Sequence, residues 1–159
     1  MIQAITETDL TTYLQTEDNR INTSVASSKI RYLVKFTNDL DKSIQYAYSN
    51  VHLVYNRYTK FSYTYNATPD VYTGAVNFKP SGYWKYEVYE VSWTGAVAIS
   101  SGNAPVTEDD VLPIGSTHGV VQGLVTKGKM YVADKSGTAQ VQYTQRQETS
   151  GTNYIYYGQ

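Results

Sequence analysis

The residue types that most often carry hydrolytic chemistry meet in the segment GSTHGV, residues 115–120. Ser116 lies two residues before His118, so a nucleophile and a base are close together in the sequence. Such a pair also requires an orienting acid and donors for the oxyanion, and no motif in the chain supplies either. We therefore interpret His118 as a turn residue and His52, which lies within a strand pattern, as a structural residue.

Carboxylates gather in the segment TEDD, residues 107–110, and hard cations prefer oxygen ligands of this kind. The alternating spacing of a calcium loop is missing, so a solvated acidic loop is the expectation and cation binding stays open. Paired-carboxylate chemistry has only Glu87 and Glu90 as candidates on a strand. Residues three apart on a strand point to opposite faces, which separates these two side chains. No catalytic residue, metal ligand or cofactor site is predicted.

The charge of the chain is balanced, with 13 basic and 14 acidic residues among 159 and a formal net charge of −1. Nucleic acid is therefore not an expected partner. No apolar run reaches the roughly 20 residues that span a bilayer, and the opening MIQAITETDL does not resemble a secretory signal. Cysteine is absent, which excludes disulfides and thiolate sites and is typical of proteins made in a reducing cytosol.

Tyrosine, threonine and valine are abundant, with 17 tyrosines, and these residue types favour strands. From Lys29 onward apolar and polar residues alternate, as in KIRYLVKF. The residues that share one face of this segment are Ile30, Tyr32, Val34 and Phe36. We expect an all-β fold over residues 29–159, a single antiparallel β-sandwich, Ig-like or jelly-roll-like, of about eight strands.

Residues 1–28 lack this alternation and are expected to form an N-terminal arm outside the sandwich. Leu10, Tyr13 and Leu14 have helical spacing, which predicts a helix of at most one or two turns. The threonines of the segment disfavour a longer helix. We expect this arm to dock on a neighbouring protein, since chain termini are otherwise loosely held.

The segment YWKYEVYEVSW, residues 83–93, contains the densest group of aromatic residues. Strict alternation places Trp84 and Val88 on one face but leaves Val91 and Trp93 out of step with them. A β-bulge near residues 89 and 90 would return these two to the core, because one extra residue reverses the facing. The residues predicted to lie inside are Trp84, Tyr86, Val88, Val91 and Trp93, and those predicted to be exposed are Glu87 and Glu90.

The rest of the chain combines a long irregular segment with further strand patterns. Residues 94–119 are rich in Gly, Pro, Ser and Asp, and a loop of this length is usually functional or mobile. VVQGLVTKGKMYVAD, residues 120–134, predicts a hairpin with its turn at Lys127 and the glycine after it. TAQVQYTQ, residues 138–145, alternates like another strand, and the chain closes on the aromatic segment NYIYYGQ.

Three segments resemble a known class of proteins: YNRYTKFSYTYNATPDVYTGAVNFKPSGYWKYEVYEVSW, GVVQGLVTKGKMYV and the closing NYIYYGQ. From about Lys29 onward the chain resembles small virion proteins of tailed bacteriophages from aquatic and environmental samples. The shared pattern is an aromatic strand, then YExYE, then a glycine-bounded segment of the form G-L-V-x-x-G-K-M-Y-V. The resemblance carries no catalytic motif, and it implies a non-enzymatic component of a virus particle.

The leading hypothesis is a capsid decoration or auxiliary protein that binds the major capsid lattice in many copies. It would assemble in the bacterial cytoplasm, remain on the virion and form a homo-oligomer, with many of its tyrosines at interfaces. The residues predicted to contact partners are Leu10, Tyr13, Leu14, Tyr154, Tyr156 and Tyr157, followed by the 101–119 loop.

Three alternatives stay open. A head–tail connector protein would contact ring neighbours in the phage neck instead of the major capsid protein. A carbohydrate-binding module of a fibre or tail would use Tyr83, Trp84 and Trp93 as stacking platforms. An enzyme would need a polar pocket around His118 and the acidic loop, and it is the least favoured. No hypothesis requires a membrane or a nucleic acid as partner.

Overall fold

The computed structural model describes residues 1–137, so the expected strand 138–145 and the aromatic tail lie outside the described residues. Within residues 1–137 the chain forms strands and two short 3₁₀ turns but no α-helix, which confirms the all-β class. The 3₁₀ turns are η1 (Glu17–Asn19) and η2 (Ser27–Lys29). The strands are β1 (Ile2–Ile5), β2 (Leu10–Leu14), β3 (Ile30–Asn38), β4 (Ile44–Tyr48), β5 (Val51–Val54), β6 (Thr59–Tyr65), β7 (Ala75–Val76), β8 (Gly82–Ser92) and β9 (Val120–Ala133).

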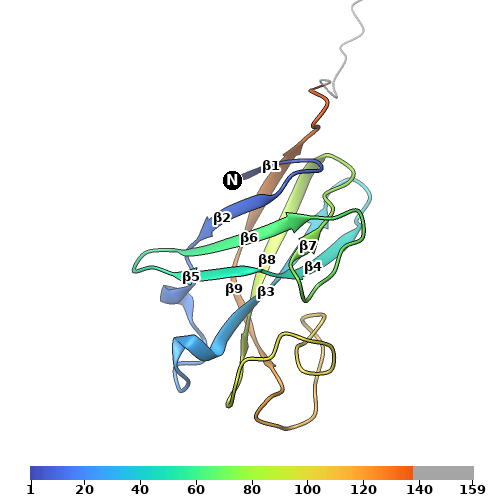
Figure 1. Ribbon diagram of the computed structural model, residues 1–159. Coiled ribbons are helices and arrows are strands. Elements are labelled where there is room, and N and C mark those ends of the chain that lie inside the picture. The colour runs from blue at the N-terminus through green and yellow to red at the C-terminus, as the bar shows by residue number, and fades with distance from the viewer. Residues whose placement is uncertain (138–159) are drawn as a thin grey trace, which may run out of the picture.

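The strands form two sheets, and Figure 1 shows the smaller sheet in front of the larger one. The larger sheet has the order β1-β9-β8-β3-β4, and the smaller has the order β2-β6-β5 with β7 beside β6. β1 runs parallel to β9 and β7 parallel to β6, while the other pairs are antiparallel. Both sheets are therefore mixed, whereas the sequence predicts a purely antiparallel arrangement.

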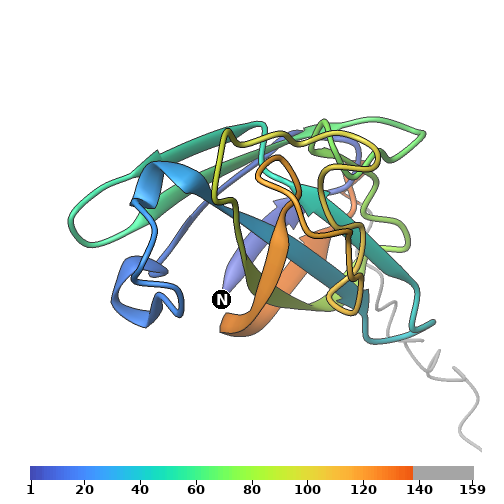
Figure 2. The same ribbon diagram turned by 90° about the horizontal axis from the view of Figure 1, so that it is seen from below.

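The principal core lies between the two sheets, which form separate layers when seen from below (Figure 2). Phe36 of β3 contacts Tyr63 of β6 with ring centroids 5.5 Å apart, and Tyr32 contacts Phe61 at 5.7 Å. Edge-to-face ring pairs of this kind add to the free energy gained from burial. The predicted alternation of β3 is confirmed, because the buried residues of this core include Ile30, Tyr32, Val34 and Phe36.

Strand β8 keeps its alternation along its whole length, and its two faces enter different clusters. Its register with β3 is continuous. Trp84 and Val88 lie in the principal core. Val91 and Trp93 lie on the opposite face, in a second cluster. These four side chains are fully buried, as predicted, and Tyr86 is partly buried against the principal core.

The predicted bulge exists, but the extra residues belong to β9 and not to β8. The pairing of these strands shifts twice, after Val88 and after Glu90, and β9 leaves Val125 and Gln122 without a partner on β8 at these points. The facing of β8 is therefore never reversed. Val91 is buried for another reason, which is a second core on the outer face of the larger sheet.

This second core covers the face of the larger sheet that is turned away from the smaller sheet. Its buried members are Leu33, Tyr48, Val91, Trp93 and Ala104. The cover comes from the irregular 94–119 segment, which lies at the lower end of the sheet in Figure 1. Tyr48 of β4 holds this segment against the sheet, because its hydroxyl donates a hydrogen bond of 2.8 Å to the Pro105 carbonyl oxygen.

Residues 1–28, expected as an arm with a short helix, contribute the strands β1 and β2 to the two sheets. The helix prediction is wrong, because Leu10 and Thr12 face the core while Tyr13 faces outward, as in a strand. The same threonines that disfavour a helix are favoured in a sheet. Leu10 lies opposite Tyr63 of β6, so this part of the chain completes its own fold.

Strand β9 is a single strand of 14 residues, and the predicted turn at Lys127 does not form. Gly128 lies opposite Tyr86 in the register of β8 and β9. A Cβ atom at Gly128 would lie 2.5 Å from the Tyr86 hydroxyl oxygen, so only glycine leaves room for the ring. The glycine that suggests a turn is a packing glycine.

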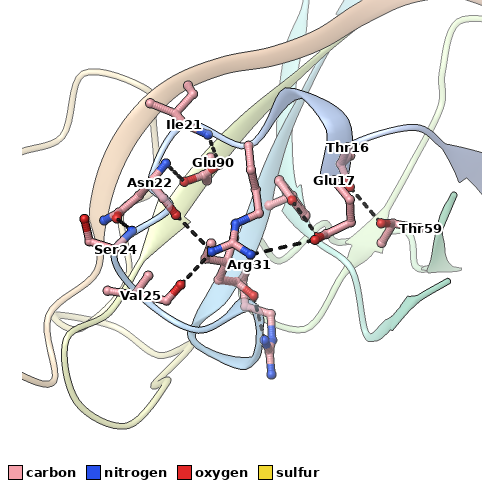
Figure 3. A network of polar contacts seen from close by, with 12 residues as sticks. Thr16, Glu17, Ile21, Asn22, Ser24, Val25, Arg31, Thr59 and Glu90 are labelled. Carbon is pink, nitrogen blue, oxygen red and sulfur yellow. Dashed lines mark hydrogen bonds and ion pairs between the residues drawn. The ribbon is translucent and has the colours of Figure 1, made fainter. Parts of the chain in front are cut away.

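Glu90 is fully buried, against the prediction that it is exposed. The backbone N–H groups of Ile21 and Asn22 donate to its two carboxylate oxygens, each at 2.8 Å (Figure 3). An unpaired buried carboxylate would be costly, and these donors remove that cost. Both donors belong to the 15–29 connection between β2 and β3, which closes over the carboxylate.

Further hydrogen bonds hold the 15–29 connection in place. The hydroxyls of Thr16 and Thr59 are hydrogen-bonded at 2.7 Å in the interior, as Figure 3 shows. Arg20 Nη2 donates to the Asn22 carbonyl oxygen at 3.0 Å. Polar contacts inside the protein, rather than an apolar stripe, thus set the path of this connection.

Replacing Glu90 by glutamine should destabilise the fold by about 1–3 kcal/mol, because the amide turns an N–H group toward a backbone N–H group. Urea unfolding measures this difference, and hydrogen exchange should become faster at Ile21 and Asn22. Glu87→Gln on the outer face of the same strand is the matched control and should change stability by less than about 0.5 kcal/mol. Equal stability of the two variants would contradict a closing role for Glu90.

Candidate partner-binding surface

The residues predicted to contact a partner do not stay together in the structure. Tyr13 is exposed over 59% of its surface. Leu10 is buried in the principal core, and Leu14 is partly buried against it. The three tyrosines of the tail lie outside the described residues. Of the N-terminal set, Tyr13 is the one whose side chain is largely exposed.

Tyr13 belongs to a cluster of exposed tyrosines at one end of the smaller sheet. Its ring meets that of Tyr58 edge to face at 5.3 Å, and the Tyr58 ring lies 4.8 Å from that of Tyr55. The last two residues flank the β5–β6 turn, where the Tyr55 N–H donates to the Tyr58 carbonyl oxygen at 2.9 Å. These three rings, which are between 41% and 59% exposed, form the tyrosine cluster.

Strand β5 extends this surface with aliphatic side chains. Val51 and Leu53, on the same face of the sheet as Tyr13, are 36% and 46% exposed. Leu53 lies opposite Lys60 of β6, and Lys60 lies opposite Tyr13 of β2, so one row of side chains crosses the sheet. Within residues 1–137 the only strand that pairs with β5 is β6. An apolar edge strand is a template for contact with another chain. We call this edge and the tyrosine cluster together the tyrosine face.

Packing beneath the tyrosine face fixes its position. Phe61 and Tyr63 on the inner face of β6 are anchored in the principal core. Ser49 fixes the entry into β5, because its hydroxyl accepts a hydrogen bond from the Ser62 N–H at 2.8 Å and donates to the Ser62 carbonyl oxygen at 3.0 Å. A surface that is rigid before binding loses less entropy on association.

The 94–119 segment supplies a second exposed apolar feature. Val111 and Ile114 are 93% and 107% exposed. The segment is nevertheless held at its base, where the Gly119 N–H donates to the Asn103 carbonyl oxygen at 2.8 Å. Two exposed aliphatic side chains on one segment are a second candidate contact surface.

Glu108 anchors the acidic part of this segment to the larger sheet. Its carboxylate accepts hydrogen bonds from Lys35 Nζ and from the Tyr46 hydroxyl. Burial alone would raise the pKa of Glu108, but these hydrogen bonds and the lysine charge outweigh burial, so its pKa lies below the ordinary value of 4.5. The same hydrogen bond raises the pKa of Lys35, and burial raises the pKa of Tyr46 to about 12. Lys35 and Glu108 therefore form a charged pair at neutral pH.

The other carboxylates of the 107–110 segment have different surroundings. Asp110 accepts hydrogen bonds from the backbone N–H groups of Val106 and Thr107, at 2.7 Å and 3.1 Å, and closes a turn. Asp109 is exposed. Within residues 1–137 no group of three or more His, Cys, Asp or Glu side chains is placed to hold a metal ion.

His118 and Ser116, the residues considered for hydrolytic chemistry, do not form a pair. The His118 N–H donates to the Gly115 carbonyl oxygen at 3.2 Å, as in a turn. A Cβ atom on Gly115 would lie 2.4 Å from His118 Nδ1, so the imidazole packs on that backbone. The buried Nδ1 atom of His118 has no hydrogen-bond partner among the described residues, so the Ser116 hydroxyl does not pair with it.

Three other candidate side chains are occupied by packing. His52 contacts the rings of Tyr32 and Phe61, and burial lowers its pKa to about 4. Trp84 and Trp93 are fully buried, so they cannot stack on a sugar at the surface. Tyr83, the third proposed stacking residue, is 56% exposed.

No protein-family model, no curated protein and no solved structure matches this chain. Among residues 1–137 no helix is long and apolar enough to cross a membrane. The candidate surface is therefore defined by its own geometry.

Sequence reasoning missed the hairpin half of the tyrosine face. The signal lies in VYNRYT, residues 54–59, where two tyrosines flank Asn56 and Arg57 between strand patterns. Aromatic residues at the tip of a hairpin extend past the core, so their rings remain exposed. Tyr55 and Tyr58 meet this condition.

Glu108→Gln tests the anchor of the 94–119 segment. Because its pKa is lowered on folding, ionised Glu108 stabilises the fold above about pH 4.5, and this contribution is lost as the pH falls through the folded value. The variant should therefore lower Tm at pH 7 by roughly 2–4 °C, and by a smaller amount near pH 3. Calorimetry at both pH values measures this, with Asp109→Asn as the control. An equal loss at both pH values would exclude an electrostatic anchor.

Proposed function

We propose that this chain is a non-enzymatic virion protein of a tailed bacteriophage, a decoration protein that binds the major capsid lattice in many copies. The observation that carries the proposal is the tyrosine face, an exposed aromatic and aliphatic surface on a rigid sheet. Tyrosine is enriched at protein interfaces because it offers large contact area at a low entropic cost. The resemblance of the sequence to small virion proteins supports the same class. In this proposal the two sheets form a β-sandwich.

The surface chemistry suits attachment to a repeating shell. Tyr13 and Tyr58 offer ring faces and hydroxyl groups together, so they can pack on apolar side chains and still form hydrogen bonds. The open edge of β5 adds backbone donors and acceptors next to them. A formal net charge of −1 keeps the mutual repulsion of crowded copies small.

Quantitative mass spectrometry of purified particles tests the location. A decoration protein should be present in a number comparable to the major capsid protein or in a simple fraction of it. About a dozen copies or fewer would instead indicate a ring-forming connector protein of the neck. Absence from the particles would overturn the virion assignment.

The tyrosine face itself can be tested by adding the purified chain to particles that lack it. Tyr13→Ser combined with Tyr58→Ser should weaken attachment at least tenfold, because exposed aromatic residues at the centre of an interface carry much of its binding free energy. Tyr83→Ser, an exposed tyrosine on the other sheet, is the matched control and should bind like the wild type. Equal binding by both variants would place the attachment surface elsewhere.

A further inference from the structure

The outer face of the larger sheet carries a groove that attachment through the tyrosine face does not use. Its volume is about 680 Å³, within the range of about 300–1,000 Å³ typical of binding pockets. The lining side chains include Lys35, Ile44, Lys85, Glu87, Lys127 and Lys129. We call it the lysine groove.

The positive charge of the lysine groove is only partly neutralised. Lys35 and Lys85 each have a carboxylate partner. Lys127 and Lys129 are exposed and form no ion pair with any residue of the described range 1–137. Lys127 lies directly opposite Glu87 in the register of β8 and β9, so Lys129 is the one of these two lysines that has no carboxylate opposite it.

The register of the strands places like charges together in the groove. Lys85 of β8 lies directly opposite Lys129 of β9, and like charges in this position destabilise a sheet. Lysines often protect an open edge, and β9 has no β1 partner before Met130. Edge protection accounts for Lys127 and Lys129 but not for Lys85, which lies on a strand paired on both sides. A bound anionic group would relieve the repulsion.

A complementary feature lies on the same side of the molecule, in the long loop after β8. Val111 and Ile114 are fully exposed, and nearby Asp109 is exposed without an ion-pair or hydrogen-bond partner among the described residues. We call these three residues the loop knob. Glu108, next to the knob, is hydrogen-bonded to Lys35 of the groove, so the knob and the groove adjoin on one face.

We propose that a second copy of this chain occupies the lysine groove, in a two-fold dimer in which the loop knob of each copy enters the groove of the other. A two-fold interface joins identical patches and must be self-complementary. This face is self-complementary, because it offers a carboxylate with aliphatic groups beside a set of ammonium groups. Asp109 pairs with Lys127 and Lys129, and the aliphatic knob residues pack on Ile44 and on the lysine stems.

Other anionic occupants fit this face less well. Glu87 lies within the groove and Glu108 lies at its margin, and they repel a polyphosphate chain or an anionic lipid surface, with its many charges, more strongly than the single carboxylate of Asp109. Neither of those partners would cover Val111 and Ile114. A partner that combines a carboxylate with aliphatic side chains can pair with the lysines and also cover Val111 and Ile114. The loop knob of a second copy has this chemistry.

Sedimentation velocity on charge-reversal variants of the purified chain tests the dimer. Lys127→Glu with Lys129→Glu, and separately Asp109→Lys, should each weaken dimerisation at least tenfold, since each places like charges at both contacts. Mixing the two variants should restore the dimer, because the mixed pair has opposite charges at both contacts. High salt should weaken the wild-type dimer.

Lys135→Glu, an exposed lysine outside the groove, is the matched control and should dimerise like the wild type. A circular dichroism spectrum like that of the wild type shows that each variant is folded, whereas Tm falls when the stabilising dimer is lost. A wild type that stays monomeric up to about 100 μM, a dimer insensitive to both charge reversals, or no recovery on mixing would overturn the proposal. Binding of a polyglutamate peptide, single-stranded DNA or anionic vesicles by a monomeric wild type would also overturn it. The result is independent of the copy number on particles.

Discussion

The fold depends on the satisfaction of one buried carboxylate. Glu90 lies on the core face of β8, where a charge without partners would be expelled or neutralised. Two backbone N–H groups point at its oxygens, and both come from the connection that leads from β2 in the smaller sheet to β3 in the larger. These two hydrogen bonds therefore give the Glu90 carboxylate its donors and close one end of the principal core. They also fix where the chain passes between the two sheets.

The local alternation of residues predicts which apolar residues of β8 are buried, but it does not predict which of the two core clusters each one joins. A strand with one buried face that contains Trp84, Val88, Val91 and Trp93 needs a bulge, whereas a strand with two buried faces needs none. The choice depends on whether the outer face of the sheet is covered. That cover comes from the 94–119 segment, and its packing is a long-range fact that alternation within β8 does not contain. The predicted exposure of Glu90 is wrong for the same reason: the backbone donors that allow its burial lie near residue 21, far away in the sequence.

The N-terminal residues show a second limit of local pattern. Leu10 and Leu14 are four residues apart, and this spacing puts two side chains on one face in a helix and in a strand alike. Only Tyr13 distinguishes the two, since it shares that face in a helix and opposes it in a strand. In the structure Tyr13 points to the face opposite that of Leu10 and Leu14. Tyr13 is therefore exposed and stays a candidate contact, while Leu10 is buried in the core. Its partner Tyr58 joins it only through the register of β2 with β6.

The two proposed interaction surfaces lie on opposite sides of the molecule. The sheets pack through their inner faces, so the tyrosine face on the smaller sheet and the lysine groove on the larger one point in opposite directions. Binding at one surface therefore leaves the other free. A two-fold dimer formed through the larger sheets would turn its two tyrosine faces away from each other.

This geometry limits what dimerisation can add. Avidity requires that both sites of a dimer reach the same target, and it is lost when geometry forbids this. Two tyrosine faces pointing apart cannot both lie on one flat lattice, so attachment to a shell would rest on the tyrosine face of a single copy. The gain from the dimer is then local. The dimer covers Val111 and Ile114, whose aliphatic surface is otherwise left in water, and it supplies a counter-charge to Lys129, which lies opposite another lysine in the single copy.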